Sequence, residues 1–447
     1  MGSFPSRGIH FSMQTGTSGK QSMRLRTRAV KLLEESIRKG EVILERDNLS
    51  HKDARLLENI LIGVAKNLYL LDCYINSVLA RNKLDTTTRN IARVALYQML
   101  FLSRVPDYAI VSEGVESARE LGFPESKCRF VNATLHRLTE AAGELQPPDE
   151  LSIRFSHPKF VVKSLVEYLG EEQALKVIEA DNKPHPTFFR INKLHKEKDR
   201  FIEKVKKNFA ISFHRWFSEY FTVSPNVTPN LLPGFAEGAF TVQNPAFAIP
   251  VLLLEPKKGE LTVEVGTAPG GKLSLIAEIV GEDAEIIGID ISADKLNITQ
   301  KNLARLGPVK NISLILADGA SLPFPDRSVE RLLIDAPCSS LGVLSKFPLA
   351  RYRKTDEDIE RLAQIQEKLL LEGARVLKKD GVLVFSTCTL TKRENTDKIL
   401  LADRFGLSVD KSYPERLEHF RLKNFFQTLP GEDGFDGCFA VRFRKLV

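Results

Sequence analysis

The sequence predicts a multidomain protein: an all-α bundle comes first, a small α/β linker domain follows, and an α/β half with a parallel sheet ends the chain. Apolar residues recur at three- and four-residue spacing from Arg24 to about Ala142, as in amphipathic helices. From Leu261 onward, apolar strands alternate with helices, as in a parallel sheet covered on both faces. The length of 447 residues suits two or three domains with buried cores.

The composition is that of a soluble globular protein with a basic excess. Of all residues, 43% are hydrophobic and 27% charged, and the net charge of +7 favours a polyanionic partner. No apolar run reaches 18 residues, so we expect no membrane span. The 5 cysteines lack zinc-like spacing, which argues against a structural metal or a disulfide framework. We therefore expect a cytoplasmic, monomeric protein without metal.

The first part of the chain predicts a tail and a helical bundle. Residues 1–23 are rich in Ser, Gly and Thr and are expected to be disordered. Residues 24–145 are expected to form the bundle, whose charge is nearly balanced. Two sets of residues show the helical spacing: Leu56, Leu57, Ile60, Leu61 and Val64, and Ile91, Val94, Ala95 and Met99.

Residues 150–235 are predicted to form the linker domain. Pro147 and Pro148 mark its start, and Ser156 is expected to cap a helix over Phe160–Leu169. The segment Phe188–Asn192 is expected to be a strand.

A basic run follows that strand. Lys193–Lys207 contains seven Lys or Arg, which suits either a track for single-stranded RNA or a solvated helix face. Trp216 is most simply a core residue.

Residues 236–447 are predicted to form the domain with the parallel sheet. A long helix is expected over Asp356–Leu377 and a final strand over Cys438–Phe443. In such sheets ligands bind at the carboxyl ends of the strands. The other expected strands are 261–265, 285–289, 312–316, 331–334 and 381–386.

The stretch from Leu261 to Asp290 has the pattern of a βαβ unit that binds a nucleotide cofactor. A strand breaks at Gly266, the chain turns through APGGK, and Asp290 stands 20 positions after Gly270. The letters are not G-x-G-x-x-G, so NAD is not favoured. A plain strand-turn-helix with glycines for the bend is the alternative.

Acidic residues follow three successive strands. Asp290 is placed to accept hydrogen bonds from ribose hydroxyls, and Asp318 to lie beside an adenine ring. Asp335 opens the sequence DAPC at the third strand end. Each aspartate alone could instead be a turn residue or a helix cap.

Two cysteines at strand ends, Cys338 in DAPC and Cys388 in STC, suggest nucleophilic chemistry. Cytosine C5 is a weak nucleophile, but a thiolate that adds to C6 makes C5 able to accept a methyl group. A proton then leaves C5, and the thiol is eliminated. A carboxyl group such as that of Asp335, near N3, would stabilise the intermediate. The alternative is two buried cysteines that act as small hydrophobic residues.

The helical region resembles the NusB-like RNA-binding domain. The matching stretches are RTRAVKLLEE, DARLLENILIGVAKNLYLLD, ARVALYQMLFLSRVPDYAIVSEGVESARELG and RFVNATLHRL, in the order of that family. The resemblance makes Arg89, Arg93, Arg129 and Arg137 candidate phosphate contacts, although solvated helix faces explain each one equally well.

Over residues 24–444 the chain resembles the RsmB/Fmu (Sun) type of ribosomal RNA cytosine-5 methyltransferase, of the RsmB/NOP2 class, with a Rossmann-like class I domain. The resemblance implies S-adenosylmethionine as cofactor and 16S ribosomal RNA as substrate. It implies that Cys388 is the nucleophile, that Cys338 assists product release, and that Asp335 serves both cofactor and base. Lys272 is expected to contact Asp335 or the substrate. The implied cofactor residues are Gly266, Thr267, Ala268, Pro269, Gly270, Gly271, Lys272, Asp290, Asp318 and Asp335.

The chain departs from the family pattern at several positions. Gly266-Thr267 stands where a Cys-Ala pair is usual, and Glu264 stands in place of an aspartate. After the Pro-Cys motif the family usually has a basic pair, His-Pro and a later Trp. This chain has Ser345–Pro348 and Tyr352 there.

Three other functions fit parts of the sequence: an RNA-binding assembly factor without catalysis, the same reaction on tRNA, and an amine methyltransferase. The last would need no TC cysteine.

Overall fold

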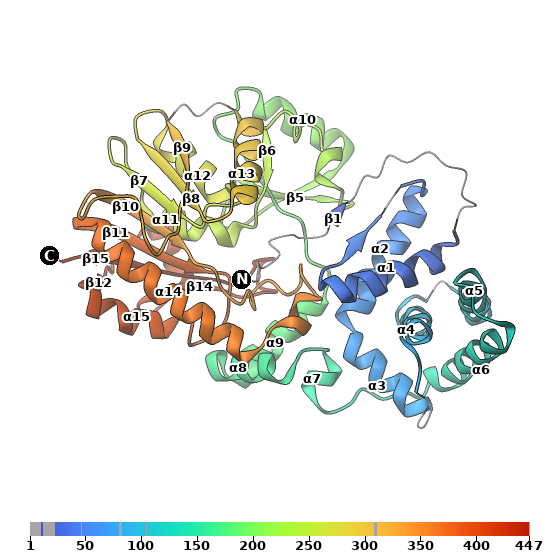
Figure 1. Cartoon of the computed structure of the whole chain (residues 1–447). Helices are drawn as coiled ribbons and strands as arrows, with labels where there is room; N and C mark the ends of the chain where they lie inside the picture. The colour runs from blue at the N-terminus through green and yellow to red at the C-terminus, as the bar shows by residue number, and fades with distance from the viewer. Residues whose placement is uncertain are drawn as a thin grey trace. The chain divides into compact units, whose positions relative to one another are not determined.

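The structure, a computed structural model, describes residues 10–11, 23–45, 47–79, 83–103, 105–307 and 311–446 (Figure 1). It divides into two compact units. The helical unit comprises Met1–Lys163, Ala174–Lys183 and Leu344–Lys354, and the sheet unit comprises the rest. The predicted multidomain architecture is confirmed. The units do not follow the predicted domain ranges, which remain a prediction.

The expected tail over residues 1–23 lies almost wholly outside the described residues. The part described includes strand β1 (His10–Phe11), which pairs in parallel with β2 (Ile43–Leu44).

The helical unit is a bundle around one apolar core. Side chains from six of its described helices are fully buried there, among them Leu33, Leu61, Ile75, Leu96 and Leu135. Polar caps start two of the helices, since the side chains of Ser50 and Asp85 accept backbone N–H groups. The helices are α1 (Leu25–Lys39), α2 (His51–Lys66), α3 (Leu68–Leu79), α4 (Thr86–Phe101), α5 (Asp107–Glu120), α6 (Glu125–Ala142) and α7 (Leu151–Arg154). They are followed in the chain by α8 (Lys159–Leu169) and α9 (Glu171–Asn182), of which Ser164–Gln173 belongs to the sheet unit.

The segment Leu344–Lys354, which follows Cys338 in the chain, belongs to the helical unit. Its Leu349 side chain joins the core of the bundle. The fully buried Arg351 guanidinium donates a hydrogen bond of 2.8 Å to Asn182 Oδ1 and lies 3.3 Å from His157 Nδ1. Tyr352 donates from its hydroxyl to Ala65 O at 3.0 Å. These contacts make the segment part of the bundle's interior.

Two predictions for the helical unit are wrong. Ser156 does not cap α8, because its backbone has a left-handed φ of 54° and its hydroxyl accepts the N–H of Leu70 at 3.1 Å. Arg93 is neither a phosphate contact nor a solvated residue: it is only 9% exposed and forms two hydrogen bonds to Asp72, of 2.8 and 2.6 Å.

Of the other three candidate arginines, Arg89 also pairs with Asp72. Arg129 and Arg137 lie exposed on α6.

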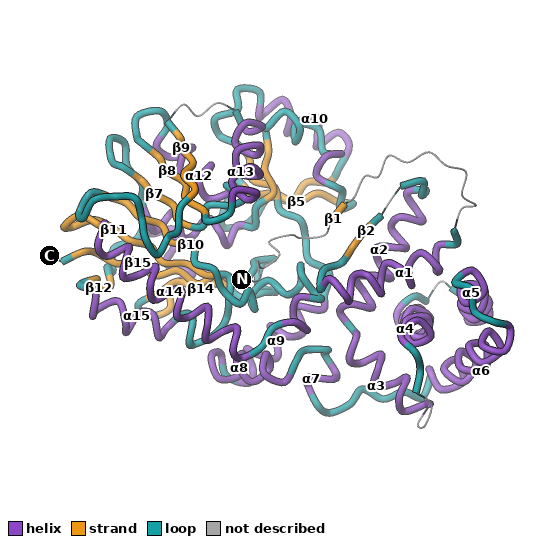
Figure 2. Tube along the Cα trace, in the orientation of Figure 1, coloured by secondary structure: helices purple, strands orange, loops and turns teal. Residues whose placement is uncertain are grey.

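Among the described residues, the main sheet of the sheet unit has nine strands, in the order β13-β14-β15-β11-β10-β7-β8-β9, with β12 paired to β15. Figure 2 draws the strands in orange. The strands from β11 to β9 in this order are parallel, and those around β15 are antiparallel. The bounds are β7 (Thr262–Val265), β8 (Ile286–Asp290), β9 (Ile312–Leu316), β10 (Val329–Asp335), β11 (Leu377–Thr387), β12 (Leu407–Val409), β13 (Arg421–Leu422), β14 (Phe425–Thr428) and β15 (Cys438–Lys445).

The predicted strands of this domain and its final strand are confirmed. The predicted long helix is also present, as α14 (Asp356–Val376). The remaining helices beside this sheet are α11 (Ile249–Leu254), α12 (Gly271–Val280), α13 (Ala293–Leu306) and α15 (Thr396–Ala402).

A second, antiparallel sheet has the order β4-β5-β3-β6. Its strands are β3 (Phe189–Ile191), β4 (Ala210–Phe213), β5 (Tyr220–Ser224) and β6 (Phe240–Val242). Thus the predicted strand over Phe188–Asn192 is confirmed. Trp216 packs against the edge of a core cluster and stacks on His419, with ring centroids 4.1 Å apart.

The basic run contains helix α10 (Lys198–Asn208), which buries Phe201, Ile202 and Val205. Its exposed cations include Arg200 and Lys206, which pair with neighbouring glutamates. The run is therefore a solvated helix face, and RNA contact along it stays a prediction. No helix among the described residues is long and apolar enough to cross a membrane.

We expect Arg351→Ala to destabilise the helical unit by about 3 kcal/mol, because it leaves the buried acceptors of the guanidinium without a hydrogen-bond donor. Hydrogen exchange of α9 amides and thermal unfolding would measure the loss. Arg353→Ala, which removes an exposed guanidinium from the same segment, is the control and should cost less than about 1 kcal/mol. Equal effects of the two substitutions would contradict the buried role of Arg351.

Candidate active site

The turn after β7 requires glycine at two positions. Gly266 has a φ of 79°, and an added Cβ would lie 2.3 Å from the carbonyl oxygen of Asp335. Gly270, at the start of α12, has a φ of 94°, and an added Cβ would lie 2.9 Å from Thr299. Asn302 Nδ2 donates to Pro269 O at 3.0 Å and fixes the turn from α13. Backbone therefore passes close to backbone at Gly266 and close to a side chain at Gly270, and both approaches need a residue without Cβ.

Two departures from the family pattern contact each other. Glu264, 1% exposed on β7, accepts a hydrogen bond of 2.7 Å from the hydroxyl of Thr267. Burial raises the pKa of Glu264 to about 8, although the charge of Lys272 and the Thr267 bond oppose the rise. The longer glutamate and the threonine thus form a hydrogen-bonded pair beneath the turn.

Lys272 and Asp335 form an ion pair at the carboxyl ends of β7 and β10. Lys272 Nζ lies 2.6 Å from Asp335 Oδ2, and the Ser386 hydroxyl donates to Asp335 Oδ1 at 3.0 Å. Burial works against the lysine cation, but the charges of Asp335 and Glu264 outweigh it and raise the pKa of Lys272. The predicted contact between Lys272 and Asp335 is present.

The two strand-end cysteines lie side by side. Their Sγ atoms are 3.3 Å apart, and the backbone N–H of Cys388 points to Cys338 Sγ at 3.4 Å. The hydrogen bond from Cys338 lowers the pKa of Cys388, with help from Ser340 and Lys272, whereas burial opposes it. The same bond and burial raise the pKa of Cys338. Of the two thiols, Cys388 is therefore the one that ionises more readily.

Asp290 and Asp318 lie at the ends of the next two strands along the same edge. Asp290 is 6% exposed and accepts the N–H of Ser292 at 3.0 Å. Asp318 is exposed and accepts the N–H of Ala320 at 2.9 Å. Each carboxylate thus accepts a local backbone N–H, as expected if the aspartate is a turn residue or a helix cap. Within the described ranges, the other oxygen of each has no hydrogen-bond partner in the protein.

The order of the parallel strands arranges these groups along one edge. The cysteines and Asp335 lie at β11 and β10, the glycine turn follows β7, and Asp290 and Asp318 follow β8 and β9. Sequence reasoning missed two polar side chains at this edge, Ser340 and the buried Glu394. Neither stands in a motif by itself, and both were recognisable only once their contacts were known.

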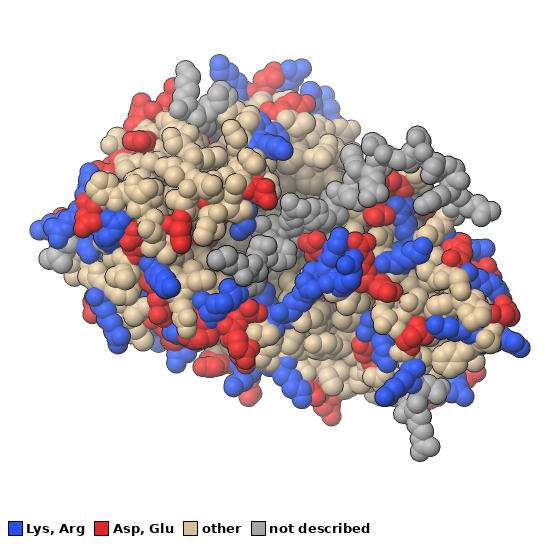
Figure 3. All heavy atoms as spheres, viewed as in Figure 1, with Lys and Arg blue, Asp and Glu red and all other residues tan. Residues whose placement is uncertain are grey.

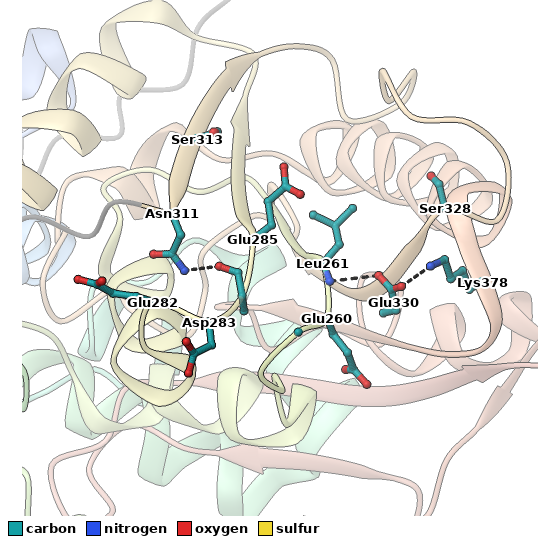
Figure 4. Close-up of a pocket in the computed structure, with 12 residues that line it drawn as sticks. Glu260, Leu261, Glu282, Asp283, Glu285, Asn311, Ser313, Ser328, Glu330 and Lys378 are labelled. Carbon is teal, nitrogen blue, oxygen red and sulfur yellow. Dashed lines mark hydrogen bonds and ion pairs between the residues drawn. The ribbon is translucent and has the colours of Figure 1, made fainter.

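A separate cavity of about 750 Å³ lies at the opposite, amino ends of the strands (Figure 4). Glu260, Glu285 and Glu330 line it, and Glu330 bonds to Lys378 and to the N–H of Leu261. It contains none of the predicted site residues. Among the described residues, no cluster of His, Cys, Asp or Glu could hold a metal ion.

Comparison with known proteins gives the family. The family described as 16S rRNA methyltransferase RsmB/F matches residues 251–444, and the NusB family matches residues 23–140. The ribosomal RNA small subunit methyltransferase B of Klebsiella pneumoniae subsp. pneumoniae is 30% identical over 394 residues, which cover 85% of this chain and 89% of that protein. The chain belongs to the RsmB/F family of 16S rRNA methyltransferases. The predicted family resemblance is thereby confirmed.

Other relatives agree with this assignment. The ribosomal RNA small subunit methyltransferase B of Escherichia fergusonii is 29% identical over 442 residues, 95% of this chain and all of that protein. The crystal structure of PH0851 shares the fold, with a TM-score of 0.75 and 22% identity over 96% of this chain and 100% of that one. A methyltransferase homologue from Pyrococcus horikoshii has a TM-score of 0.55 and 28% identity, covering 66% of this chain and 98% of that one.

We expect Glu264→Gln to be more stable than wild type, by a margin that grows as the pH rises from 5 to 8. The folded-state pKa of about 8 lies above the ordinary value of 4.5, so the native carboxyl keeps a proton that the unfolded chain loses. Stability from this group is full below pH 4.5 and is lost as the pH rises through 8. The gain at pH 8 should be on the order of a few kcal/mol.

Melting temperatures from pH 5 to 8 test the expectation, with the exposed Glu285→Gln as control. A wild-type and Glu264→Gln difference that is independent of pH would contradict it.

Proposed function

We propose that this protein methylates C5 of a cytosine in small-subunit ribosomal RNA, through a covalent bond from Cys388 Sγ to C6 of the base. The observation that carries the proposal is the thiol pair: the Sγ atoms of Cys338 and Cys388 are 3.3 Å apart, and the pKa of Cys388 is the lowered one. A nucleophile beside a proton donor is what addition to C6 and later elimination require.

The reaction uses each group in turn. The Cys388 thiolate adds to C6, so the electron pair of the C5–C6 double bond becomes available at C5. S-adenosylmethionine, the cofactor that family membership gives this chain, supplies an electrophilic methyl group when bound. The C5 proton then passes to solvent water, its electron pair re-forms the C5–C6 double bond, and the bond from Cys388 to C6 breaks so that the sulfur leaves as a thiolate. Cys338, held protonated, is assigned to assist this release.

Asp335 is assigned to the base. A carboxyl group beside N3 stabilises the adduct, and this carboxyl is held in one orientation by Lys272 on one oxygen and Ser386 on the other. Fixed hydrogen bonds of this kind reduce the reorganisation that the reaction needs.

The residues of the turn and the next strand ends fit S-adenosylmethionine by their chemistry. The carboxylate of Asp290 suits ribose hydroxyls, and the exposed Asp318 suits the adenine amino group. Gly266 to Lys272 would surround the methionine part. The free second oxygens of Asp290 and Asp318 are consistent with these roles.

Ribosomal RNA is the proposed substrate because of the relatives and the NusB family match. Over the face in view in Figure 3, Lys and Arg are interspersed with Asp and Glu. Phosphate contacts are therefore expected at a few exposed arginines, such as Arg129 and Arg137 on α6, and not across one broad basic surface. The same reaction on tRNA is the alternative.

We expect Cys338→Ala to accumulate a covalent RNA adduct, because Cys388 can add to C6 while release is impaired. Protein is incubated with S-adenosylmethionine and unmodified small-subunit ribosomal RNA, and adducts are resolved on a denaturing gel. Cys388→Ala should give no adduct and should lower methyl transfer by at least about 1,000-fold.

Wild type and the buried Cys438→Ala are the controls, since Cys438 lies outside the thiol pair. An adduct that requires Cys338 instead would reverse the two roles. Activity on tRNA alone would favour the alternative substrate, and no adduct or transfer with any version would favour an assembly factor.

We expect Asp290→Asn to weaken binding of S-adenosylmethionine by about tenfold, since an amide replaces a charged acceptor for the ribose hydroxyls. Titration calorimetry measures the affinity, and the exposed Asp294→Asn on α13 is the matched control. Unchanged affinity in Asp290→Asn would remove Asp290 from the cofactor site.

A further inference from the structure

One buried acid connects the two cysteine loops. Glu394 follows β11 and the Cys388 loop in the chain, and it is 0% exposed. A fully buried carboxylate is expensive unless hydrogen bonds satisfy it. Its partners therefore show which parts of the structure it stabilises.

The first set of partners belongs to the Cys338 loop. Ser339, directly after Cys338, donates its backbone N–H to Glu394 Oε1 at 2.8 Å and its hydroxyl to Oε2. Gln366 on α14 donates from Nε2 to Glu394 Oε1 at 3.2 Å and to Pro337 O at 3.0 Å. The residues on both sides of Cys338 are thus bonded to the acid, directly or through Gln366.

The second set belongs to the Cys388 loop. Thr391 donates its hydroxyl to Glu394 Oε2 at 2.9 Å. The hydroxyl of Thr389, directly after Cys388, lies 2.6 Å from that of Ser339. The two loops also bond through their backbones, since Gly342 N–H donates to Cys388 O at 3.0 Å. Glu394 is therefore central to a network that contains the residue after each cysteine.

The hydrogen-bond network suits a carboxylate at this position, because a carboxylate only accepts hydrogen bonds. Two donors reach Oε1 and two reach Oε2, which occupies both carboxylate oxygens. Burial raises the pKa of Glu394, and these donors oppose the rise. A glutamine at this position would direct an amide N–H₂ at donors, and an alanine would deprive all four donors of this acceptor.

We infer that Glu394 is the positioning residue that holds the Cys338 and Cys388 loops at the spacing of their thiol contact. The inference rests on the proposed function, in which that contact sets which thiol adds to the base and which assists release. Glu394 itself touches neither sulfur and acts through Ser339, Thr389 and Thr391.

The test measures the thiol spacing directly. Diamide oxidises two close thiols to a disulfide: the S–S bond forms as the two S–H bonds break, and diamide takes up the two electrons and two protons. Formation of the Cys338–Cys388 disulfide is followed by mass spectrometry in wild type, Glu394→Gln, Glu394→Ala and Glu360→Gln. The last removes an exposed glutamate that pairs with neighbouring Arg393 and is the matched control.

We expect Glu394→Gln to slow disulfide formation by about tenfold and Glu394→Ala to slow it further, because the bond needs specific geometry. Methyl-transfer kcat should fall by about 100-fold, with S-adenosylmethionine affinity within twofold of wild type. Glu360→Gln should match wild type in each measurement.

Wild-type disulfide rates in both Glu394 variants would overturn the inference. If these variants do not fold, Thr389→Val decides, since it removes the hydroxyl beside Ser339 and leaves Glu394 in place; an unchanged disulfide rate in it would also overturn the inference. Absence of methyl transfer in wild type would refute the proposed function alone, because the disulfide rates do not depend on RNA.

Discussion

The parallel pairing of β10 with β11 is the constraint on which the site depends. Asp335 pairs with Ser386 at the carboxyl ends of these strands, and Ala336 N–H continues the pairing to Ser386 O at 2.9 Å. The two chains therefore leave the sheet at the same level, which brings the cysteines that follow into contact. A slip by one residue would turn every side chain to the other face and separate these groups.

Lys272 is the counter-charge shared by the acids and thiols of the site. It pairs with Asp335, opposes the pKa rise of Glu264 and contributes to the lowered pKa of Cys388. Because these groups lie in a poorly solvated region, each depends on the charge state of the others. Binding of a cationic cofactor would thus alter the whole set, and not a single residue.

Features that depend on local pattern were predictable from the sequence, and those that depend on distant partners were not. Apolar runs with short turns located the parallel strands, and residues after them located Asp335 and the cysteines. In contrast, the burial of Arg93 depends on its ion pair with Asp72 from another helix, and the bond of the Ser156 hydroxyl depends on the N–H of Leu70. The role inferred for Glu394 likewise depends on Ser339 and Gln366, which only the fold brings to it.

The discontinuous course of the helical unit affects how the protein is made. Residues 1–183 emerge from the ribosome early. Leu349 and Arg351, which complete the interior of this unit, are synthesised only after β7 to β10. Domains usually fold in order of synthesis, N-terminal first. Here the N-terminal bundle remains incomplete while much of the parallel sheet is translated, so its last step of folding during translation awaits a segment from the C-terminal half.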